Sequence, residues 1–148
     1  MKAVLQRVKY AKVSVEGRIV GQIGRGLLVY LGVAEGDLAE DAAYLAEKAS
    51  FLRIFDDSEG KMNLSVQEIQ GAVLTVSQFT LLADSRKGRR PSYAHAAKPE
   101  QARILYQHFI DQIRSQGIPC QEGSFQAYME VEYLNDGPVT IILESIPR

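Results

Sequence analysis

Cysteine and histidine are scarce in this chain of 148 residues, which contains one cysteine and two histidines. A single cysteine, Cys120, excludes an intramolecular disulfide and is typical of proteins from reducing compartments. Because histidine and cysteine are the preferred ligands of zinc in proteins, we expect no zinc site. We interpret Cys120 as a small buried hydrophobic residue. We expect a surface role for His108 and assign no role to His95.

Long apolar runs and strong net charge are also missing. No segment approaches the roughly 20 apolar residues that span a bilayer, and Lys2 and Arg7 interrupt the N-terminus too early for a signal peptide. The net charge is −1, so the overall charge does not indicate a nucleic-acid partner. Hydrophobic residues make up 46% of the chain and charged residues 24%, which is ordinary for a globular protein. We therefore expect a soluble, cytoplasmic protein with a single domain over residues 1–148.

The common catalytic motifs are absent as well. The sequence has no Gly-x-Ser-x-Gly elbow, no His-Glu-x-x-His zinc motif, no phosphate-binding loop and no Gly-x-Gly-x-x-Gly. The acidic residues Asp56, Asp57 and Glu59 precede Gly60 and read as a solvated turn. The residues alone therefore offer no conventional hydrolytic machinery.

What the sequence does contain is mainly β-structure. Residues 26–33 form a continuous apolar run, typical of a strand buried on both faces. Residues 72–77 predict a second strong strand, and residues 53–55 a short one. Apolar residues alternate with polar ones over 125–133, which predicts a strand that the turn at 135–138 ends before a last strand starts at Val139.

Two helices are expected between the strands. The first takes Asp37 as N-cap, with Glu40 in the capping-box position; its buried face would carry Leu38, Ala42, Leu45, Ala49 and Leu52. The second begins at Pro99 and ends at Gly117; its inward residues would be Ala102, Leu105, Phe109 and Ile113. The class we predict is α+β, one domain with a mainly antiparallel, barrel-like sheet core and two main helices.

Positive charge is concentrated in one short segment. Residues 85–91 contain Arg86, Lys87, Arg89 and Arg90, which are four cations within five positions. A solvated loop is the plain interpretation. The same loop can hold phosphates if neighbouring side chains point the same way.

Two short segments stand where predicted strands end, namely Ser-Gln-Phe-Thr at 77–80 and Asn-Asp-Gly-Pro-Val-Thr at 135–140. Either one alone is an ordinary strand end or turn. Together, in this order and spacing, they resemble the paired motifs of the D-aminoacyl-tRNA deacylase family. The resemblance extends over nearly the whole chain, including 7–8, 60–63 and 87–92. One departure is Gln126, because the family usually has glycine after the phenylalanine equivalent to Phe125.

The resemblance implies an ester hydrolase that acts on D-aminoacyl-tRNA as a homodimer, with active sites at the subunit interface. Gly137 and Pro138 of one subunit would form a cis peptide and reach into the pocket of the other. Their carbonyl oxygens would exclude the side chain of an L-amino acid, whereas glycyl-tRNA, with no side chain to exclude, would be a substrate. Arg7 would support this loop, and Met129 and Phe125 would line the pocket.

For the chemistry, the resemblance assigns backbone N–H groups of Gln78 and Phe79 to the carbonyl oxygen of the tetrahedral intermediate. Ser77 and Thr80 would position the terminal adenosine, whose 2′-hydroxyl would help to activate water. Thr80 as a nucleophile is an alternative, but no histidine or lysine lies nearby in sequence to activate it. No metal or organic cofactor is implied.

In the same picture the cluster of Arg86, Lys87, Arg89 and Arg90 would contact the tRNA backbone. Two rival functions stay open from sequence. One is a nucleic-acid-binding module without catalysis. The other is an esterase or amidase for small D-amino-acid derivatives, which would ignore the tRNA body and the 2′-hydroxyl.

Overall fold

The computed structural model describes residues 1–145. Its elements, in chain order, are β1 (Lys2–Val15), β2 (Arg18–Ile23), β3 (Gly26–Gly32), α1 (Ala39–Phe51), β4 (Phe55–Asp56), β5 (Met62–Leu64), β6 (Ala72–Ser77), the 3-10 helix η1 (Phe79–Leu82), α2 (Pro99–Ser115), β7 (Cys120–Glu122) and β8 (Glu130–Glu144). The α+β class with two main helices is confirmed.

One mixed sheet organises the domain, with strand order β2-β1-β3-β6-β7 and β8 paired to β1. Strand β1 is antiparallel to β2, β3 and β8, whereas β3–β6 and β6–β7 are parallel pairs. The sheet curls until β2 approaches β7. A Cβ at Gly21 would lie 2.6 Å from the Glu122 carbonyl oxygen, so only glycine permits this approach. The sheet is therefore nearly closed and barrel-like.

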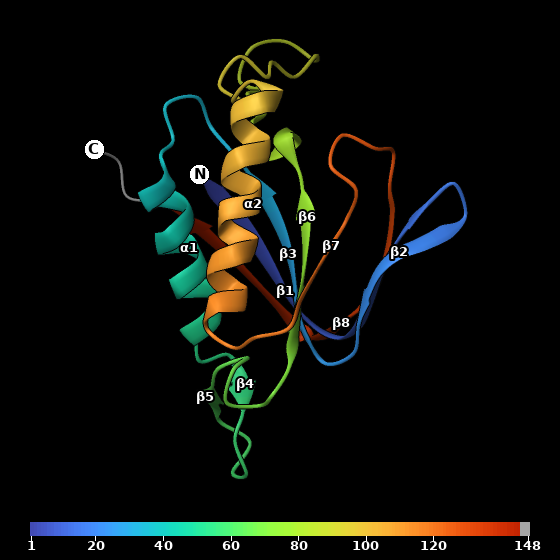
Figure 1. Cartoon of the computed structure of the whole chain (residues 1–148), viewed down its shortest axis with the longest axis vertical. Helices are drawn as coiled ribbons and strands as arrows, with labels where there is room; N and C mark the ends of the chain where they lie inside the picture. Colours follow the sequence, from blue (N-terminus) through green and yellow to red (C-terminus); the bar gives the residue numbers. More distant parts are fainter. Residues whose placement is uncertain (146–148) are drawn as a thin grey trace.

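Two hydrophobic clusters lie on opposite faces of the central strand β3. Helices α1 and α2 cover one face of the sheet (Figure 1), where Leu27, Val29 and Leu31 of β3 are fully or almost fully buried. Leu28 points to the other face and joins the second cluster with Val8. The predicted strand with two covered faces is thus confirmed.

The start of α1 differs from the prediction. The N-cap is Leu38, whose backbone N–H donates to the Asp41 carboxylate at 2.7 Å. Asp37 instead accepts from the Ala34 N–H at 2.6 Å and from the N-terminal ammonium at 2.7 Å. Because these contacts engage Asp37, the capping role moves one residue on, from Asp37 and Glu40 to Leu38 and Asp41. Leu38 itself is exposed, whereas the predicted inward residues Ala42, Leu45 and Ala49 are fully buried.

The C-terminal strand also differs. No strand covers 125–129, and β8 begins only at Glu130. It then continues to Glu144 through the segment that we expected to end it. The reason is the side chain of Asn135, whose amide donates to the carbonyls of Arg7 and Val139 at 3.1 Å each. These bonds replace ladder hydrogen bonds where the β1–β8 register shifts, so that pairing resumes beyond the shift.

Helix α2 starts at Pro99 and the chain turns away at Gly117, whose φ is +77°, as the sequence predicts. The short strand expected at 53–55 lies at Phe55–Asp56 instead. Over residues 1–145 no helix is both long and apolar enough to cross a membrane.

Candidate functional site

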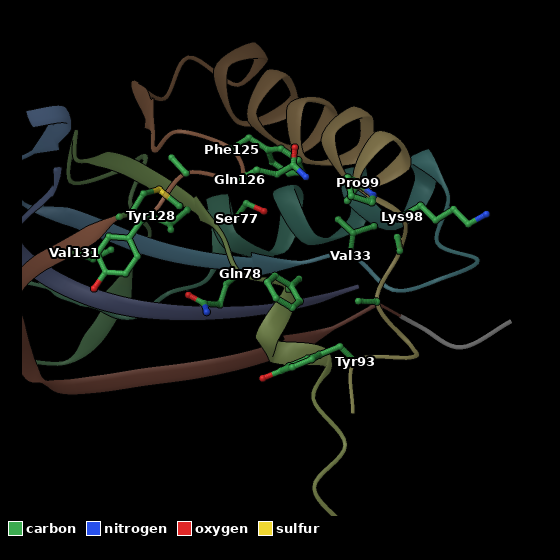
Figure 2. Close-up of a pocket in the computed structure, with 17 residues that line it drawn as sticks. Val33, Ser77, Gln78, Tyr93, Lys98, Pro99, Phe125, Gln126, Tyr128 and Val131 are labelled. Atoms are coloured by element: carbon green, nitrogen blue, oxygen red, sulfur yellow. The ribbon is translucent and has the colours of Figure 1, made fainter. Parts of the chain in front are cut away.

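A pocket of about 730 Å³ opens where the parallel strands β3 and β6 end (Figure 2). This volume lies within the roughly 300–1,000 Å³ typical of small-molecule sites, and strand ends are a common place for them. One wall is the start of α2, and another is the segment 125–129 before β8. Its lining residues are Val33, Val76, Ser77, Gln78, Phe79, Tyr93, Ala96, Ala97, Lys98, Pro99, Ala102, Phe125, Gln126, Ala127, Tyr128, Met129 and Val131.

The first motif lies at this pocket. Ser77 ends β6, and Ser77, Gln78 and Phe79 line the cavity. Thr80 is not among the lining residues, but its hydroxyl accepts a hydrogen bond from the Gln78 side-chain amide. Three residues of the motif therefore line the pocket, and the fourth, Thr80, contacts one of them.

One backbone donor of this motif is already engaged. The N–H of Gln78 donates to the Leu31 carbonyl at 2.8 Å, because the β3–β6 ladder extends one residue past the strand. The N–H of Phe79 opens the 3-10 helix η1 and has no hydrogen-bond partner within residues 1–145. Of the two donors expected from sequence, Phe79 is therefore the free one, and Gln78 contributes its side chain.

The pocket wall at 125–129 contains a further unusual residue. Gln126 adopts a φ of +63°, in the left-handed region that favours glycine. Glycine, the residue that the family resemblance implies at this position, would adopt this conformation without strain. Phe125 and Met129 line the same wall, and a Cβ at Gly123 would lie 2.8 Å from the Met129 sulfur, so the wall is tightly packed.

Aromatic side chains surround the mouth of the pocket. Phe79 contacts Tyr93 edge to face, with 5.0 Å between ring centroids. Tyr128 is 87% exposed. In Figure 2, Tyr93 and Tyr128 lie on opposite sides of Gln78. Exposed rings of this kind provide surfaces on which unpaired bases stack.

The chemistry of the lining is sparse. Of the lining side chains in the described part of the chain, Lys98 alone is charged. None of them is a histidine, a cysteine or a carboxylate. Over residues 1–145, no cluster of three or more such side chains is placed to hold a metal ion. Within the described residues, the polar groups that this lining offers a reaction are backbone N–H groups, hydroxyls, side-chain amides and the Lys98 ammonium.

The second motif lies elsewhere. Gly137 and Pro138 are joined by a cis peptide in β8, and the buried Arg7 donates to the Asp136 carbonyl at 3.0 Å. The same guanidinium donates to the Ile54 carbonyl at 2.7 Å. None of these residues lines the pocket of its own chain.

The distance between the two motifs can be estimated along strand β3. Arg7 pairs with Leu27 near the start of β3, whereas Val33 at the pocket follows its end. Six residues at about 3.3 Å each put the two about 20 Å apart along the strand. Figure 1 shows the start of α2 and the β4–β5 hairpin at opposite ends of the molecule. One chain therefore does not bring Gly137 and Pro138 to its own pocket.

The basic segment forms a closed loop beside the pocket. Asp84 and Ser92 pair through two backbone hydrogen bonds of 2.8 and 2.9 Å, and Tyr93 at the pocket mouth follows directly. The Asp84 carboxylate accepts from Arg86 Nε at 2.9 Å and from its Nη2 at 2.7 Å. These hydrogen bonds from Arg86 hold the pKa of Asp84 well below its usual range.

The four cations of this loop thus divide into two kinds. Arg86 is engaged with Asp84, whereas Lys87, Arg89 and Arg90 are exposed and have no ion-pair partner within residues 1–145. Three free positive side chains therefore face solvent near the pocket.

Several pocket residues were not predicted from sequence, notably Tyr93, Lys98 and Tyr128. The segment 93–98 reaches the pocket because backbone bonds attach it to the end of β3: Ala97 donates to the Val33 carbonyl at 2.9 Å, and Glu35 donates to the His95 carbonyl at the same distance. No local pattern in the sequence signals this pairing. By contrast, the interpretation of Cys120 is confirmed: it is buried, and burial raises the pKa of its thiol.

Comparison with known proteins now adds to this geometry. Residues 4–144 match the model of the family described as D-Tyr-tRNA(Tyr) deacylase. A protein named D-aminoacyl-tRNA deacylase from Geobacter sp. (strain M21) is 60% identical over 148 residues, which cover 100% of this chain and 99% of that protein. Another of the same name, from Koribacter versatilis (strain Ellin345), is 59% identical and covers 98% of this chain and 97% of its own length.

Two solved structures are similar. The c-Myc DNA Unwinding Element Binding Protein has a TM-score of 0.94 and 43% identity, over 99% of this chain and 100% of that one. A probable eukaryotic D-amino acid tRNA deacylase has a TM-score of 0.81 over 97% and 98% of the two chains. At 18% identity, the second structure supports the fold alone.

Proposed function

Since this chain belongs to the D-Tyr-tRNA(Tyr) deacylase family, we propose that it hydrolyses the ester bond of D-aminoacyl-tRNA in the cytoplasm, releasing the free D-amino acid and the tRNA. The family expected from the two motifs, and with it an enzyme, is confirmed. The observation that carries the proposed reaction is the placement of the 77–80 motif at the pocket. Of the two backbone donors expected from this motif, the Phe79 N–H has no hydrogen-bond partner within residues 1–145.

The proposed chemistry uses little from side chains. A water oxygen attacks the ester carbonyl, and the Phe79 N–H stabilises the oxygen that becomes negative. The bond from the carbonyl carbon to the ribose oxygen then breaks, and that oxygen takes a proton. Because the pocket lining holds no histidine or carboxylate in the described residues, the neighbouring 2′-hydroxyl of the RNA is the group proposed to activate the water. Ser77 and Thr80 hold the ribose in place.

Selection for D-amino acids is proposed to come from a second subunit. The cis Gly137–Pro138 segment lies about 20 Å from the pocket of its own chain along β3. A homodimer would bring Gly137 of the partner subunit to the pocket, where its carbonyl oxygen excludes an L side chain and leaves glycine free to enter. Arg7 then acts by holding this segment through Asp136.

The uncovered edge of β8 also supports a dimer. Within residues 1–145, β8 pairs with β1 alone, so its other edge is unpaired over 15 residues. Long free edges are usually protected by another chain or element, and a two-fold pair is the commonest oligomer.

The decisive experiment compares D-Tyr-tRNA with L-Tyr-tRNA as substrates of the wild-type protein. We expect rapid loss of the D ester, with the L ester spared, and cleavage of Gly-tRNA. Replacing the terminal ribose with its 2′-deoxy form should slow hydrolysis sharply if the RNA activates the water. Equal cleavage of the 2′-deoxy substrate and of a small D-tyrosine ester would instead favour the simple esterase.

A mixing experiment tests the shared active site. Thr80→Val damages the pocket, and Gly137→Ala damages the segment offered to the partner. If the two impaired proteins are unfolded together and refolded, random pairing makes half of the dimers mixed, and each mixed dimer has one intact site. Activity should then recover to about a quarter of the wild-type value. No recovery would mean that both residues act within one chain.

A nucleic-acid-binding module without catalysis remains the second candidate. It is supported by the similar structure named as a DNA-unwinding-element binding protein and by the three free cations of the basic loop. Salt-sensitive binding of tRNA without cleavage of any ester would establish this function in place of hydrolysis.

A further inference from the structure

Gln126 lines the pocket from the segment that precedes β8. Its φ is +63°, a backbone conformation that residues other than glycine, asparagine and aspartate rarely adopt. Glycine would satisfy the backbone here without strain. The backbone conformation alone therefore does not explain the presence of a glutamine side chain at this position.

One contact orients the amide of Gln126 in this structure. Its Oε1 accepts a long hydrogen bond of 3.4 Å from Arg103 Nη2 on α2. The Arg103 guanidinium lies over the Phe125 ring, 4.7 Å from the centroid. Since Arg103 bonds to the oxygen, the amide nitrogen of Gln126 is left without a partner within residues 1–145.

The wall beneath this amide is anchored to the sheet. Phe125 packs on Tyr106, with 5.7 Å between ring centroids. The Tyr106 hydroxyl is buried and donates to the Thr75 carbonyl at 2.8 Å, two residues before Ser77 in β6. The position of Gln126 is therefore tied to the same strand that presents the first motif. Figure 2 shows Gln126 next to Phe125, with Ser77 on the neighbouring strand.

We propose that the Gln126 amide recognises the base of the terminal adenosine, with its Nε2 donating to adenine N7 and its Oε1 accepting from the N6 amino group. This inference rests on the proposed function, which places that adenosine in the pocket. Glutamine and asparagine pair with this edge of adenine through two hydrogen bonds. The oxygen has a second lone pair besides the one that Arg103 occupies.

The test uses three D-Tyr-tRNA substrates that differ only in the last base, which is adenine, 7-deazaadenine or purine. The first analogue lacks the N7 acceptor and the second lacks the amino group. For the wild-type protein we expect kcat/KM to fall roughly tenfold with either analogue, mainly through KM, in line with the discrimination that such pairs provide. Gln126→Gly should cleave all three substrates at similar rates, close to the wild-type rate on the analogues.

Gln126→Gly is well suited to this comparison because glycine accepts the left-handed backbone, so the variant is expected to fold. Arg103→Ala, which frees the amide to rotate, should weaken the preference for adenine and leave the chirality of the reaction unchanged. Equal cleavage of the three substrates by the wild-type protein would overturn this inference while the deacylase function stands. A preference for adenine that persists in Gln126→Gly would also overturn it. Failure of the wild-type protein to cleave even the natural substrate would overturn the proposed function, and this inference with it.

Discussion

Arg7 donates a hydrogen bond from its Nε to the backbone carbonyl of Asp136 at 3.0 Å, across 129 positions of sequence. Its Nη1 donates to the Ile54 carbonyl at 2.7 Å. One buried side chain thus connects β1, the segment before β4 and the Gly137–Pro138 segment. Stability and the placement of the second motif therefore depend on the same guanidinium.

Replacing Arg7 with alanine should reduce both properties. Two buried or partly buried carbonyls lose their donor, and each unsatisfied group costs about 1–3 kcal/mol. We expect the free energy of unfolding, measured with urea, to fall by about 2–4 kcal/mol. Arg7→Lys keeps the charge without the two-point geometry, so it should lose activity more than stability. Lys2, whose half-exposed side chain pairs with Glu144 at the surface, provides the control, and Lys2→Ala should change neither property noticeably.

Gly137 tolerates no side chain in this structure. Its φ is +126°, and a Cβ would lie 2.9 Å from Arg7 Nη2 and 2.9 Å from Val139 Cγ2. Gly137→Ala should therefore displace the segment that rejects L substrates and strongly reduce hydrolysis of D-Tyr-tRNA. Gly36→Ala is the matched control, because Gly36 also has positive φ but open space around it. A Gly137→Ala protein with normal rates and normal chirality would contradict the assigned role.

Thr80 offers a distinction between positioning and nucleophilic attack. Its hydroxyl accepts from the Gln78 amide, which suits a side chain that holds the substrate. Thr80→Ser should retain most activity, whereas Thr80→Val should lower kcat/KM at least about tenfold, the equivalent of one lost hydrogen bond. Mass spectrometry of rapidly quenched reactions provides the counter-test. An aminoacyl group found on Thr80 would establish the nucleophile instead.

The basic loop should control the salt dependence of tRNA binding. Lys87, Arg89 and Arg90 are exposed, so alanine at any one of them should weaken binding and reduce the slope of log K against log salt by about 1. Lys61 lies by the β4–β5 hairpin at the other end of the molecule (Figure 1), and Lys61→Ala should leave the slope unchanged. The low pKa of Asp84 keeps its pair with Arg86 charged in mild acid. A loop that binds RNA should consequently keep its shape from neutral pH to about pH 5.

Alkaline pH should destabilise the fold through Tyr30. Burial, with Tyr133 nearby, raises the pKa of Tyr30 to about 12 from a usual value of 10.0. The neutral phenol is therefore favoured in the folded state. Its contribution to stability is complete below pH 10 and is lost as the pH rises from 10 towards 12. Tyr30→Phe should flatten the dependence of the unfolding free energy on pH in this window. Unchanged dependence in this variant would assign the alkaline effect to another group.

Local sequence signals predicted the ends of those elements that are set by the backbone preferences of neighbouring residues. Pro99 and Gly117 bound α2 because each residue has a backbone preference that needs no distant partner. Asp37 was predicted to begin α1, but its carboxylate contacts the N-terminal ammonium, 36 positions away. Helix propensity depends on nearby residues and cannot predict a contact with a residue so distant in sequence. The predicted start of α1 was therefore wrong by one residue.

The site shows the same division. Alternation over 125–133 looked like a strand, yet only the part from Glu130 onward pairs with β1. All five residues of 125–129 line the pocket, so their alternation does not mark the two faces of a strand. Ser77 and Phe79 of the first motif line the pocket. Lys98 and Tyr93 join them only through backbone pairing between distant segments, which periodicity does not reveal.

The buried thiol of Cys120 has a practical consequence. It is the chain's only cysteine, and its burial and raised pKa make it a poor target for maleimide or iodoacetamide reagents. A cysteine introduced at an exposed position such as Lys87 would then be the single reactive thiol of the protein. Fluorescent or spin labels attached there would report the approach of RNA to the basic loop without any cysteine-free background having to be engineered first.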